Sequence, residues 1–251
     1  MLKKLKDELA FDIRVILDHY NEATLFKKQF FEKEIIINYE SKNIPLSFKG
    51  IIDKTMLYED ESQKYIAIID YKTGKAKIEL ENIEHGVGMQ LPVYLYLANN
   101  NNEFKEYKFA GFYLQMILDD ETKHEVGKTR EELRQSYLKL VGYSTNNTSI
   151  LSKFDNTYIS SNYIKGMKYS LKNNDFYSYS KVLSEEEMNS FVTNVEEKIK
   201  QAFDNILNAN FDIAPLEIDG KNIGCSYCEF KDICYKDYNK EVSESGNEMD
   251  E

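Results

Sequence analysis

The clearest pattern in the chain is an apolar run, Ile66 to Ile69, followed at once by the charged segment Asp70-Tyr71-Lys72. A continuous apolar run of this length predicts a strand buried on both faces, here over residues 63–72. A second apolar strand is predicted over residues 46–58, and the acidic turn at 59–61 joins the two strands as a hairpin. A charged group beside a buried strand is costly without a counter-charge, so Asp70 requires a cationic partner.

The periodicity of the remaining chain predicts further strands and helices. Apolar residues recur at helical spacing over residues 1–18, and the pattern favours strands over 30–39 and 107–118. Helices are predicted over 84–99, 129–140 and 184–208, the last opened by a capping box of Ser184 and Glu187. Residues 142–143 are predicted to form a turn.

Length and composition predict one elaborated domain over residues 1–240 of the 251, because a chain of this size buries one sizeable core. Within it we expect a core at about 30–118, an insertion at about 119–180 and a long helix with a cysteine segment at about 184–238. Residues 241–251 are expected to be an acidic disordered tail. The sequence has no apolar run of about 18 residues and no signal-peptide core, so we expect no membrane association and a cytoplasmic location.

The formal net charge of −11 argues against a free-standing, general DNA-binding protein, since affinity for duplex DNA comes mainly from neutralising phosphates. If this chain acts on DNA, a partner is expected to supply additional basic surface.

Two carboxylates and a lysine converge in the predicted hairpin. Asp70 and Lys72 are two residues apart, so on a strand they project from the same face, and Asp53 joins them if the strands pair. Oxygen ligands from aspartates suit Mg²⁺ or Mn²⁺. The residues alone leave a second reading open, in which Asp-x-Lys is a surface salt bridge at the end of a strand.

Three motifs occur in an order that resembles a known family. They are Gly50-Ile-Ile-Asp53, Ile69-Asp70-Tyr71-Lys72-Thr73-Gly74 and Gln90-Leu-Pro-Val-Tyr94. This order is similar to the RecB-like branch of the PD-(D/E)xK nuclease superfamily. Gly142-Tyr143, the segment 180–187 and the cysteines 225, 228 and 234 further resemble the C-terminal nuclease domains of AddB-type subunits, over about residues 31–237.

The resemblance implies an α/β fold with the PD-(D/E)xK, restriction-endonuclease-like core, in which helices flank a mixed central sheet. It also implies that Asp53 and Asp70 bind Mg²⁺ or Mn²⁺ and that Lys72 activates water. Glu34 would support the metal site, although a solvent-facing strand carboxylate is the alternative. Gln90 would contact the substrate phosphate or the attacking water, and Tyr94 would either border the site or serve as a core aromatic.

In function, the resemblance implies a metal-dependent DNA exonuclease in an AddAB-type helicase–nuclease. Its partner would be an AddA-like helicase–nuclease subunit, its substrate the DNA strands unwound there, and its role double-strand-break repair and recombination. AddB-type nucleases act on the strand that ends 5′. The alternatives are a catalytically inactive module that binds DNA ends or scaffolds the complex, and a small stand-alone exonuclease. The metal-binding histidine of the family is expected upstream of this chain, because the surroundings of His19 do not match its motif.

Cys225-x2-Cys228-x5-Cys234 is a compact thiol group of the kind that holds Zn²⁺ or an iron–sulfur cluster, both of which normally take four ligands. In AddB-type domains such cysteines join a fourth to hold a [4Fe–4S] cluster. Because this chain has three cysteines, we expect the cluster in a longer protein and absent or incomplete here. Reduced free thiols are the alternative.

Overall fold

The computed structural model describes residues 2–41, 44–74, 77–78, 80–117, 126–160, 162–213, 215–226, 228–231 and 233–234. The chain divides into two compact units, one reaching to Ile199 and the other beginning at Lys200. The predicted acidic tail and residues 42, 43 and 118–125 are among those outside the described residues. The boundaries proposed from the sequence therefore stay predictions.

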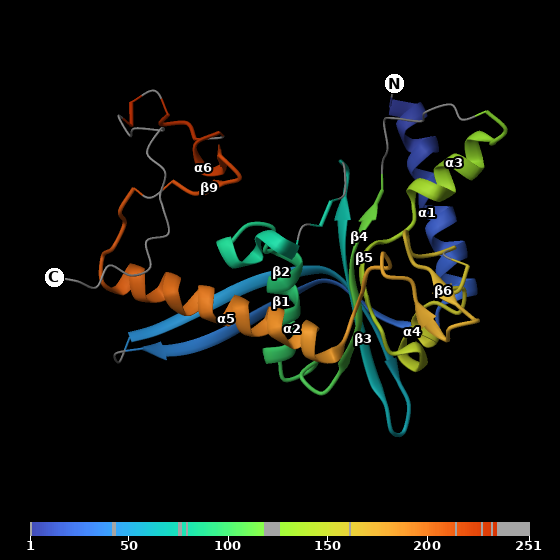
Figure 1. Cartoon of the computed structure of the whole chain (residues 1–251), viewed down its shortest axis with the longest axis horizontal. Coiled ribbons are helices and arrows are strands. Elements are labelled where there is room, and N and C mark those ends of the chain that lie inside the picture. Colours follow the sequence, from blue (N-terminus) through green and yellow to red (C-terminus); the bar gives the residue numbers. More distant parts are fainter. Residues whose placement is uncertain are drawn as a thin grey trace. The chain divides into compact units, whose positions relative to one another are not determined.

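A mixed six-stranded sheet forms the centre of the first unit, in the order β1-β2-β3-β4-β5-β8 (Figure 1). The strands are β1 (Lys28–Ser41), β2 (Ile44–Glu59), β3 (Lys64–Lys72), β4 (Lys108–Met116), β5 (Val141–Thr145) and β8 (Val182–Leu183). β3 pairs in parallel with β4, and β5 with β8, whereas the other neighbours are antiparallel. The predicted α/β fold with a mixed central sheet is confirmed.

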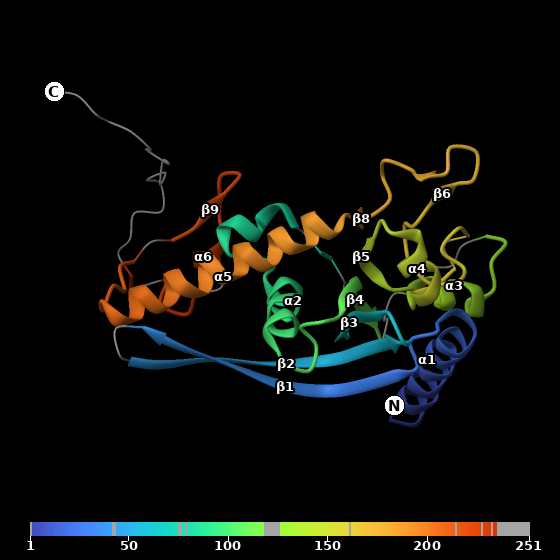
Figure 2. The ribbon, with the colours of Figure 1, turned by 90° about the horizontal axis from the view of Figure 1, so that it is seen from below.

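Helices flank this sheet, with α2 on one side of β3 and β4 and α1 and α4 on the other (Figure 1). The helices are α1 (Leu2–Ala23), the 3-10 helix η1 (Leu80–His85), α2 (Gln90–Asn100), α3 (Arg130–Tyr137), α4 (Thr148–Phe154), α5 (Glu185–Leu207) and α6 (Ile223–Ser226). Two short hairpins, β6–β7 (Tyr169–Ser170 and Asp175–Phe176) and β9–β10 (Glu217–Ile218 and Lys221–Asn222), complete the described elements. The part of α5 that belongs to the first unit runs along β1 and β2 (Figure 2).

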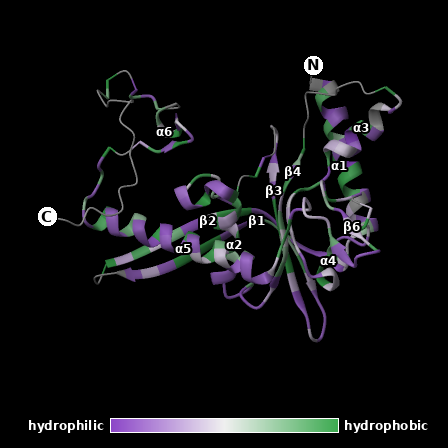
Figure 3. Cartoon of the chain, in the orientation of Figure 1, coloured by the Kyte–Doolittle hydropathy of each residue, from purple (hydrophilic) through white to green (hydrophobic). Residues whose placement is uncertain are grey.

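The hydrophobic core explains why these elements form. Ile66, Ala67 and Ile68 on β3 are fully buried, which confirms the prediction of a strand covered on both faces. On the side of α1 and α4, Phe154 stacks on Tyr113 with ring centroids 5.1 Å apart. On α1, apolar and polar residues alternate as expected for a helix with one face against the sheet (Figure 3). None of the described helices is long and apolar enough to cross a membrane.

The predicted start of the second helix was wrong. α2 begins at Gln90 instead of residue 84, because Gly86 and Gly88 adopt φ values of 78° and 70°, which end η1 and separate it from α2. Gln90 therefore stands in the first turn of its helix, directed at the end of β3. The boundary error matters because it concerns a candidate site residue.

The predicted turn at residues 142–143 was also wrong, since both residues lie in β5. Gly142 is opposite Tyr113, and a Cβ atom at Gly142 would overlap the carbonyl oxygen of Phe112. This glycine therefore serves close approach of two strands. The segment expected to be an insertion supplies one strand of the central sheet.

The capping box of α5 is confirmed. The backbone N–H of Ser184 donates to Oε2 of Glu187 at 2.7 Å, and the N–H of Glu187 donates to Oγ of Ser184 at 3.1 Å. Both hydrogen bonds satisfy groups that would otherwise lack partners at the start of the helix.

Candidate active site

Asp70 and Lys72 lie at the carboxyl end of β3, where the strand leaves the core. Asp70 is 1% exposed, although it carries a carboxylate. Nζ of Lys72 lies 2.6 Å from Oδ2 of Asp70 and supplies the counter-charge that the sequence required. The lysine side chain remains one-third exposed, so its amine faces both the buried carboxylate and the solvent.

Two side chains near the start of α2, Gln90 and Tyr94, complete the group formed by Asp70 and Lys72. Nε2 of Gln90 donates to Oδ1 of Asp70 at 2.7 Å, while Oε1 of Gln90 accepts from Nζ of Lys72 at 2.7 Å. The hydroxyl of Tyr94 lies 3.1 Å from Nε2 of Gln90 and donates to Oδ1 of Asp70 at 3.4 Å. Because the residues are four apart, one helical face presents both to the strand, as predicted.

Asp53 reaches the same place from β2. The regular pairing of β2 with β3 ends at Lys54 and Ile69, so Asp53 and Asp70 occupy the next positions on the two strands. Beyond that pair, Oδ2 of Asp53 accepts the backbone N–H of Tyr71 at 3.0 Å, so a side chain of β2 takes the place of a backbone partner for β3. The amide of Tyr71 was not foreseen, since every residue except proline offers an N–H and side-chain patterns give no sign of which one is used.

Burial sets the protonation behaviour of this group. Desolvation raises the pKa of Asp70, and the hydrogen bond and charge of Lys72 oppose that rise. Burial also raises the pKa of Tyr94, so its hydroxyl remains a hydrogen-bond donor at neutral pH. The predicted alternative for Asp70-x-Lys72, an exposed salt bridge, does not describe a carboxylate that is almost completely buried.

Glu34 lies apart from these contacts. It pairs with Ile51 across the β1–β2 ladder, and its carboxylate lies 2.6 Å from Nζ of Lys49. Both side chains of this ion pair are about half exposed. The structure therefore brings together Asp53, Asp70, Lys72, Gln90 and Tyr94, and places Glu34 in an ion pair outside their hydrogen-bonded group.

The two aspartates have the character required to hold a divalent cation. Oδ2 of Asp70 is buried and is paired with the Lys72 amine at 2.6 Å, so a cation bound there would share this oxygen with the lysine. Oδ1 of Asp53 receives no hydrogen bond from any described group, since Tyr71 occupies Oδ2. Hard oxygen ligands of this kind fit Mg²⁺ or Mn²⁺. In the part of the chain that the structure describes, no three acidic, histidine or cysteine side chains gather at one point, so the remaining positions would fall to water or substrate.

The cysteine segment does not form a preassembled cluster site in its described part. Cys225 and Cys234 are half-buried and Cys228 is exposed, and all three are free thiols. These cysteines do not come together as a ligand group within the described residues. The three thiols thus do not fit a four-ligand cluster by themselves, and the cluster stays a prediction for a longer protein. The side chain of His19, on α1, lies outside the described residues.

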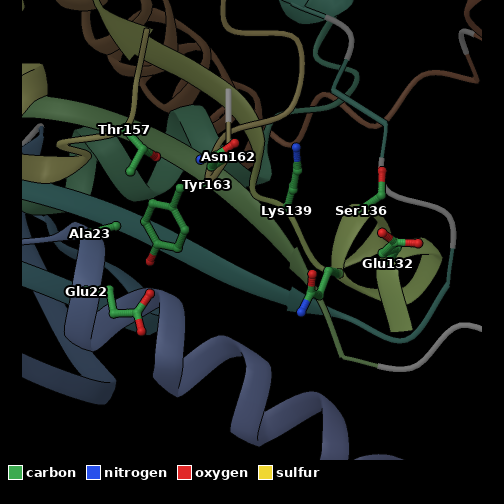
Figure 4. A pocket seen from close by; sticks show the side chains of 9 residues that line it. Glu22, Ala23, Glu132, Ser136, Lys139, Thr157, Asn162 and Tyr163 are labelled. Atoms are coloured by element: carbon green, nitrogen blue, oxygen red, sulfur yellow. The ribbon is translucent and has the colours of Figure 1, made fainter. Parts of the chain in front are cut away.

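A polar cavity of about 410 Å³ lies elsewhere in the first unit (Figure 4). Glu22 on α1, Glu132 on α3, Lys139 and Tyr163 are among the residues that line it. None of the hydrogen-bonded residues around Asp70 lines this cavity. The candidate active site is therefore the group of side chains at the end of β3, and the cavity is not part of it.

At the end of β3, neighbouring strands thus supply two aspartates and a lysine, and the next helix supplies a glutamine and a tyrosine. The profile of the PD-(D/E)XK nuclease superfamily matches residues 2–235. The chain belongs to the PD-(D/E)XK nuclease superfamily.

Similar curated proteins are described as the B subunits of ATP-dependent helicase/deoxyribonucleases. The relative from Thermoanaerobacter sp. (strain X514) is 29% identical over 80% of this chain and 18% of the relative. That from Carboxydothermus hydrogenoformans is 28% identical over 93% of this chain and 22% of the relative. One from Clostridium perfringens is 29% identical over 75% of this chain and 17% of the relative. The chain thus spans about a fifth of the length of the curated relatives it matches.

Proposed function

We propose that this chain is a metal-dependent deoxyribonuclease module that hydrolyses phosphodiester bonds of DNA strands. The observation that carries the proposal is the buried Asp70 carboxylate, held by Lys72, Gln90 and Tyr94 beside Asp53. The similarity to helicase/deoxyribonuclease B subunits supports DNA as the substrate. The proposal extends to an AddA-like helicase–nuclease partner and to a role in double-strand-break repair and recombination.

Asp53 and Asp70 would hold Mg²⁺ or Mn²⁺ through Oδ1 and Oδ2, respectively. Oδ1 of Asp53 receives no hydrogen bond from the described residues, and Oδ2 of Asp70 is paired with the Lys72 amine. When bound, the ion acidifies a water molecule and stabilises negative charge on the phosphate. The structure gives Gln90 a fixed orientation, since its amide oxygen accepts from Lys72 and its amide nitrogen donates to Asp70.

Lys72 supplies the positive charge of the group. Its side chain is one-third exposed, so we expect the amine to reach a phosphate oxygen or an attacking water without leaving the strand end. A cation fixed at this position stabilises the charge that builds up on the phosphate in the transition state. Tyr94 positions Asp70 through its hydroxyl.

The decisive experiment compares Lys72→Met with Lys64→Met in cleavage of a single-stranded oligonucleotide. Lys64 lies at the other end of β3 and pairs with Glu106 on the surface, so it controls for the loss of one lysine from the same strand. We expect Lys72→Met to lose on the order of 10²-fold or more in rate, typical of removing a preorganised charged donor, while Lys64→Met cleaves like the wild type. Oligonucleotides labelled at the 5′ or the 3′ end report the polarity of cleavage.

Calorimetric titration of Mg²⁺ and Mn²⁺ into the wild type and Asp70→Asn completes the test. Metal binding that disappears in Asp70→Asn supports the assigned ligands. A Lys72→Met variant that cleaves at the wild-type rate would refute the role of the lysine. DNA-end binding by a wild type that neither binds metal nor cleaves would favour the inactive, end-binding module.

A further inference from the structure

A second surface of the first unit has a composition unlike the rest of the chain. Residues 165–181 contain four lysines and one aspartate, in a chain whose formal net charge is −11. Lys165, Lys168 and Lys172 are exposed, and no described carboxylate lies in ion-pair contact with them. We call the three lysines together with Tyr177 and Tyr179 the Tyr–Lys surface.

The two tyrosines are presented to solvent as a stacked pair. Their ring centroids lie 5.5 Å apart at an interplanar angle of 28°, and the side chains are 46% and 59% exposed for Tyr177 and Tyr179. Nζ of Lys168 lies 5.8 Å from the centre of the Tyr179 ring. Large aromatic rings are normally buried against the core, so an exposed pair beside an ammonium group suggests a binding role.

The surface is held rigidly by its own backbone. Oγ of Ser180 accepts the N–H of Lys168 at 3.1 Å and donates to the carbonyl oxygen of the same residue at 2.7 Å. The N–H of Tyr177 donates to that carbonyl at 3.2 Å, so the turn that carries both rings is fixed to Lys168. Rigid presentation reduces the entropy lost when a ligand binds.

The adjacent β6–β7 hairpin anchors this turn to the core. Tyr169 and Phe176 face each other across the hairpin with ring centroids 5.0 Å apart. Both rings contact Tyr158, at 5.5 Å and 6.3 Å, and Tyr158 packs against the buried core cluster of the α1 and α4 side. The tyrosine pair is therefore not a loose loop tip.

Exposed aromatic rings beside lysines match the chemistry of single-stranded nucleic acid. Bases of a single strand stack on aromatic side chains whatever their sequence, and lysines neutralise the phosphates between them. The bases of a duplex already stack on one another and cannot do this without unpairing. Stacking on the exposed rings therefore favours a single strand over a duplex or an acidic protein, and the lysines complement the phosphates of that strand.

The start of the segment lies at the end of the sheet that holds Asp70, whereas its last residue, Lys181, accepts the N–H of Ser144 near the other end of β5. The N–H of Lys165 donates to the carbonyl of Leu140 at 2.8 Å, and Leu140 precedes Val141, the partner of Leu114 on β4. Leu114 in turn pairs with Asp70. Three strand spacings of about 4.8 Å place the start of the segment about 15 Å from Asp70, at the same edge of the sheet.

We propose that the Tyr–Lys surface binds single-stranded DNA by stacking bases on Tyr177 and Tyr179, and that it directs the strand to the edge that holds Asp70 and Lys72. The proposal rests on the proposed function for its substrate class. The binding step is independent of metal and of cleavage.

The test measures the affinity of the whole chain for a fluorescent oligothymidylate by anisotropy, with EDTA present. We expect Tyr177→Ala and Tyr179→Ala each to weaken binding at least about 5-fold, because loss of one stacked base weakens binding by about 5- to 150-fold. Tyr179→Phe should bind like the wild type because the ring remains. Leu171→Ala is the matched control, since Leu171 lies in the same segment, is 73% exposed and has no ring. Lys168→Met should reduce the salt dependence of log K by about 0.7.

A tryptophan probe reports stacking directly. The chain contains no tryptophan, so Tyr179→Trp introduces a single tryptophan that can be excited selectively at wavelengths where tyrosine does not absorb. We expect its emission to be quenched by the oligothymidylate and not by a blunt duplex, while Ile13→Trp, at a position 47% exposed on α1, shows no quenching.

The outcomes separate this proposal from the proposed function. Wild-type affinity in both alanine variants, or no binding of the single strand by the wild type, overturns the Tyr–Lys surface as a DNA site even if the chain cleaves DNA. Weakened binding in those variants supports it even if the wild type fails to cleave, in which case the proposed enzymatic function alone is refuted.

Discussion

A buried ion pair joins α1 to α3 across 122 residues of sequence. Nε of Arg134 donates to Oδ1 of Asp12 at 2.6 Å, and its second nitrogen donates to Oδ2 at 2.9 Å. The side chains of Asp12 and Arg134 are only 1% and 7% exposed, so both charges are withdrawn from water. Glu8 lies 3.9 Å from the guanidinium and is the next carboxylate in reach.

Arg134→Met should cost about 3–5 kcal/mol of unfolding free energy, because it leaves the Asp12 carboxylate buried without its partner. Asp12→Leu should lower the unfolding free energy by an amount near the lower end of that range, because the Arg134 guanidinium still has Glu8 nearby. The double variant should be less destabilised than either single one, because an apolar pair of similar volume often replaces a buried ion pair with little loss. With a urea slope of about 2 kcal/mol/M, the Arg134→Met midpoint falls by about 1.5–2.5 M.

Urea unfolding followed by far-ultraviolet circular dichroism measures all three variants. The matched control is the pair of Lys33 and Glu103, whose contact distance is also 2.6 Å but whose side chains are 29% and 41% exposed. Lys33→Met should cost less than about 1 kcal/mol, since water screens the pair. The reasoning fails if Arg134→Met and Lys33→Met have the same midpoint, or if the costs of the two single substitutions at the buried pair simply add.

Two further substitutions test the sheet. Burial lowers the pKa of Lys54 to about 8, so the unfolded chain binds more protons than the folded one from about pH 8 to the ordinary lysine pKa near 10.5. The urea midpoint of the wild type should therefore rise with pH through that window. Lys54→Met should be more stable than the wild type at pH 7 and should show no such rise. A wild-type urea midpoint that does not change with pH would contradict this. Gly142→Ala should lower the unfolding free energy by about 1–3 kcal/mol, because the added Cβ would overlap the Phe112 carbonyl oxygen. An unchanged thermal midpoint would show that β4 and β5 can move apart without loss of stability.

The local part of the site was predictable from sequence because short-range rules govern it. Two apolar strands joined by a polar turn bring Asp53 and Asp70 to neighbouring positions, and the period of two puts Lys72 beside Asp70. Gln90 and Tyr94 share a helical face wherever their helix begins, so the wrong helix start did not remove them from the site.

Long-range features escaped prediction for physical reasons. The pair of Asp12 and Arg134 depends on how α1 and α3 meet, which no local periodicity encodes. Gly142 resembled a turn residue, since glycine permits both turns and close strand approach, and only the neighbouring strand decides between them. The ion pair of Glu34 with Lys49 likewise depends on the β1–β2 register.

The acidic balance of the chain is compatible with a DNA substrate once the charges are located. Asp70 is almost completely buried and held by Lys72, so its charge does not face an approaching strand. Lys165, Lys168 and Lys172 are exposed, in a segment that starts at the end of the sheet where Asp70 lies. Since phosphate attraction falls off over about 10 Å at moderate salt, this local positive field acts on a bound strand more strongly than distant acidic surface does. The net charge therefore argues against indiscriminate binding to duplex DNA, while the Tyr–Lys surface that we propose for a single strand carries a local excess of positive charge.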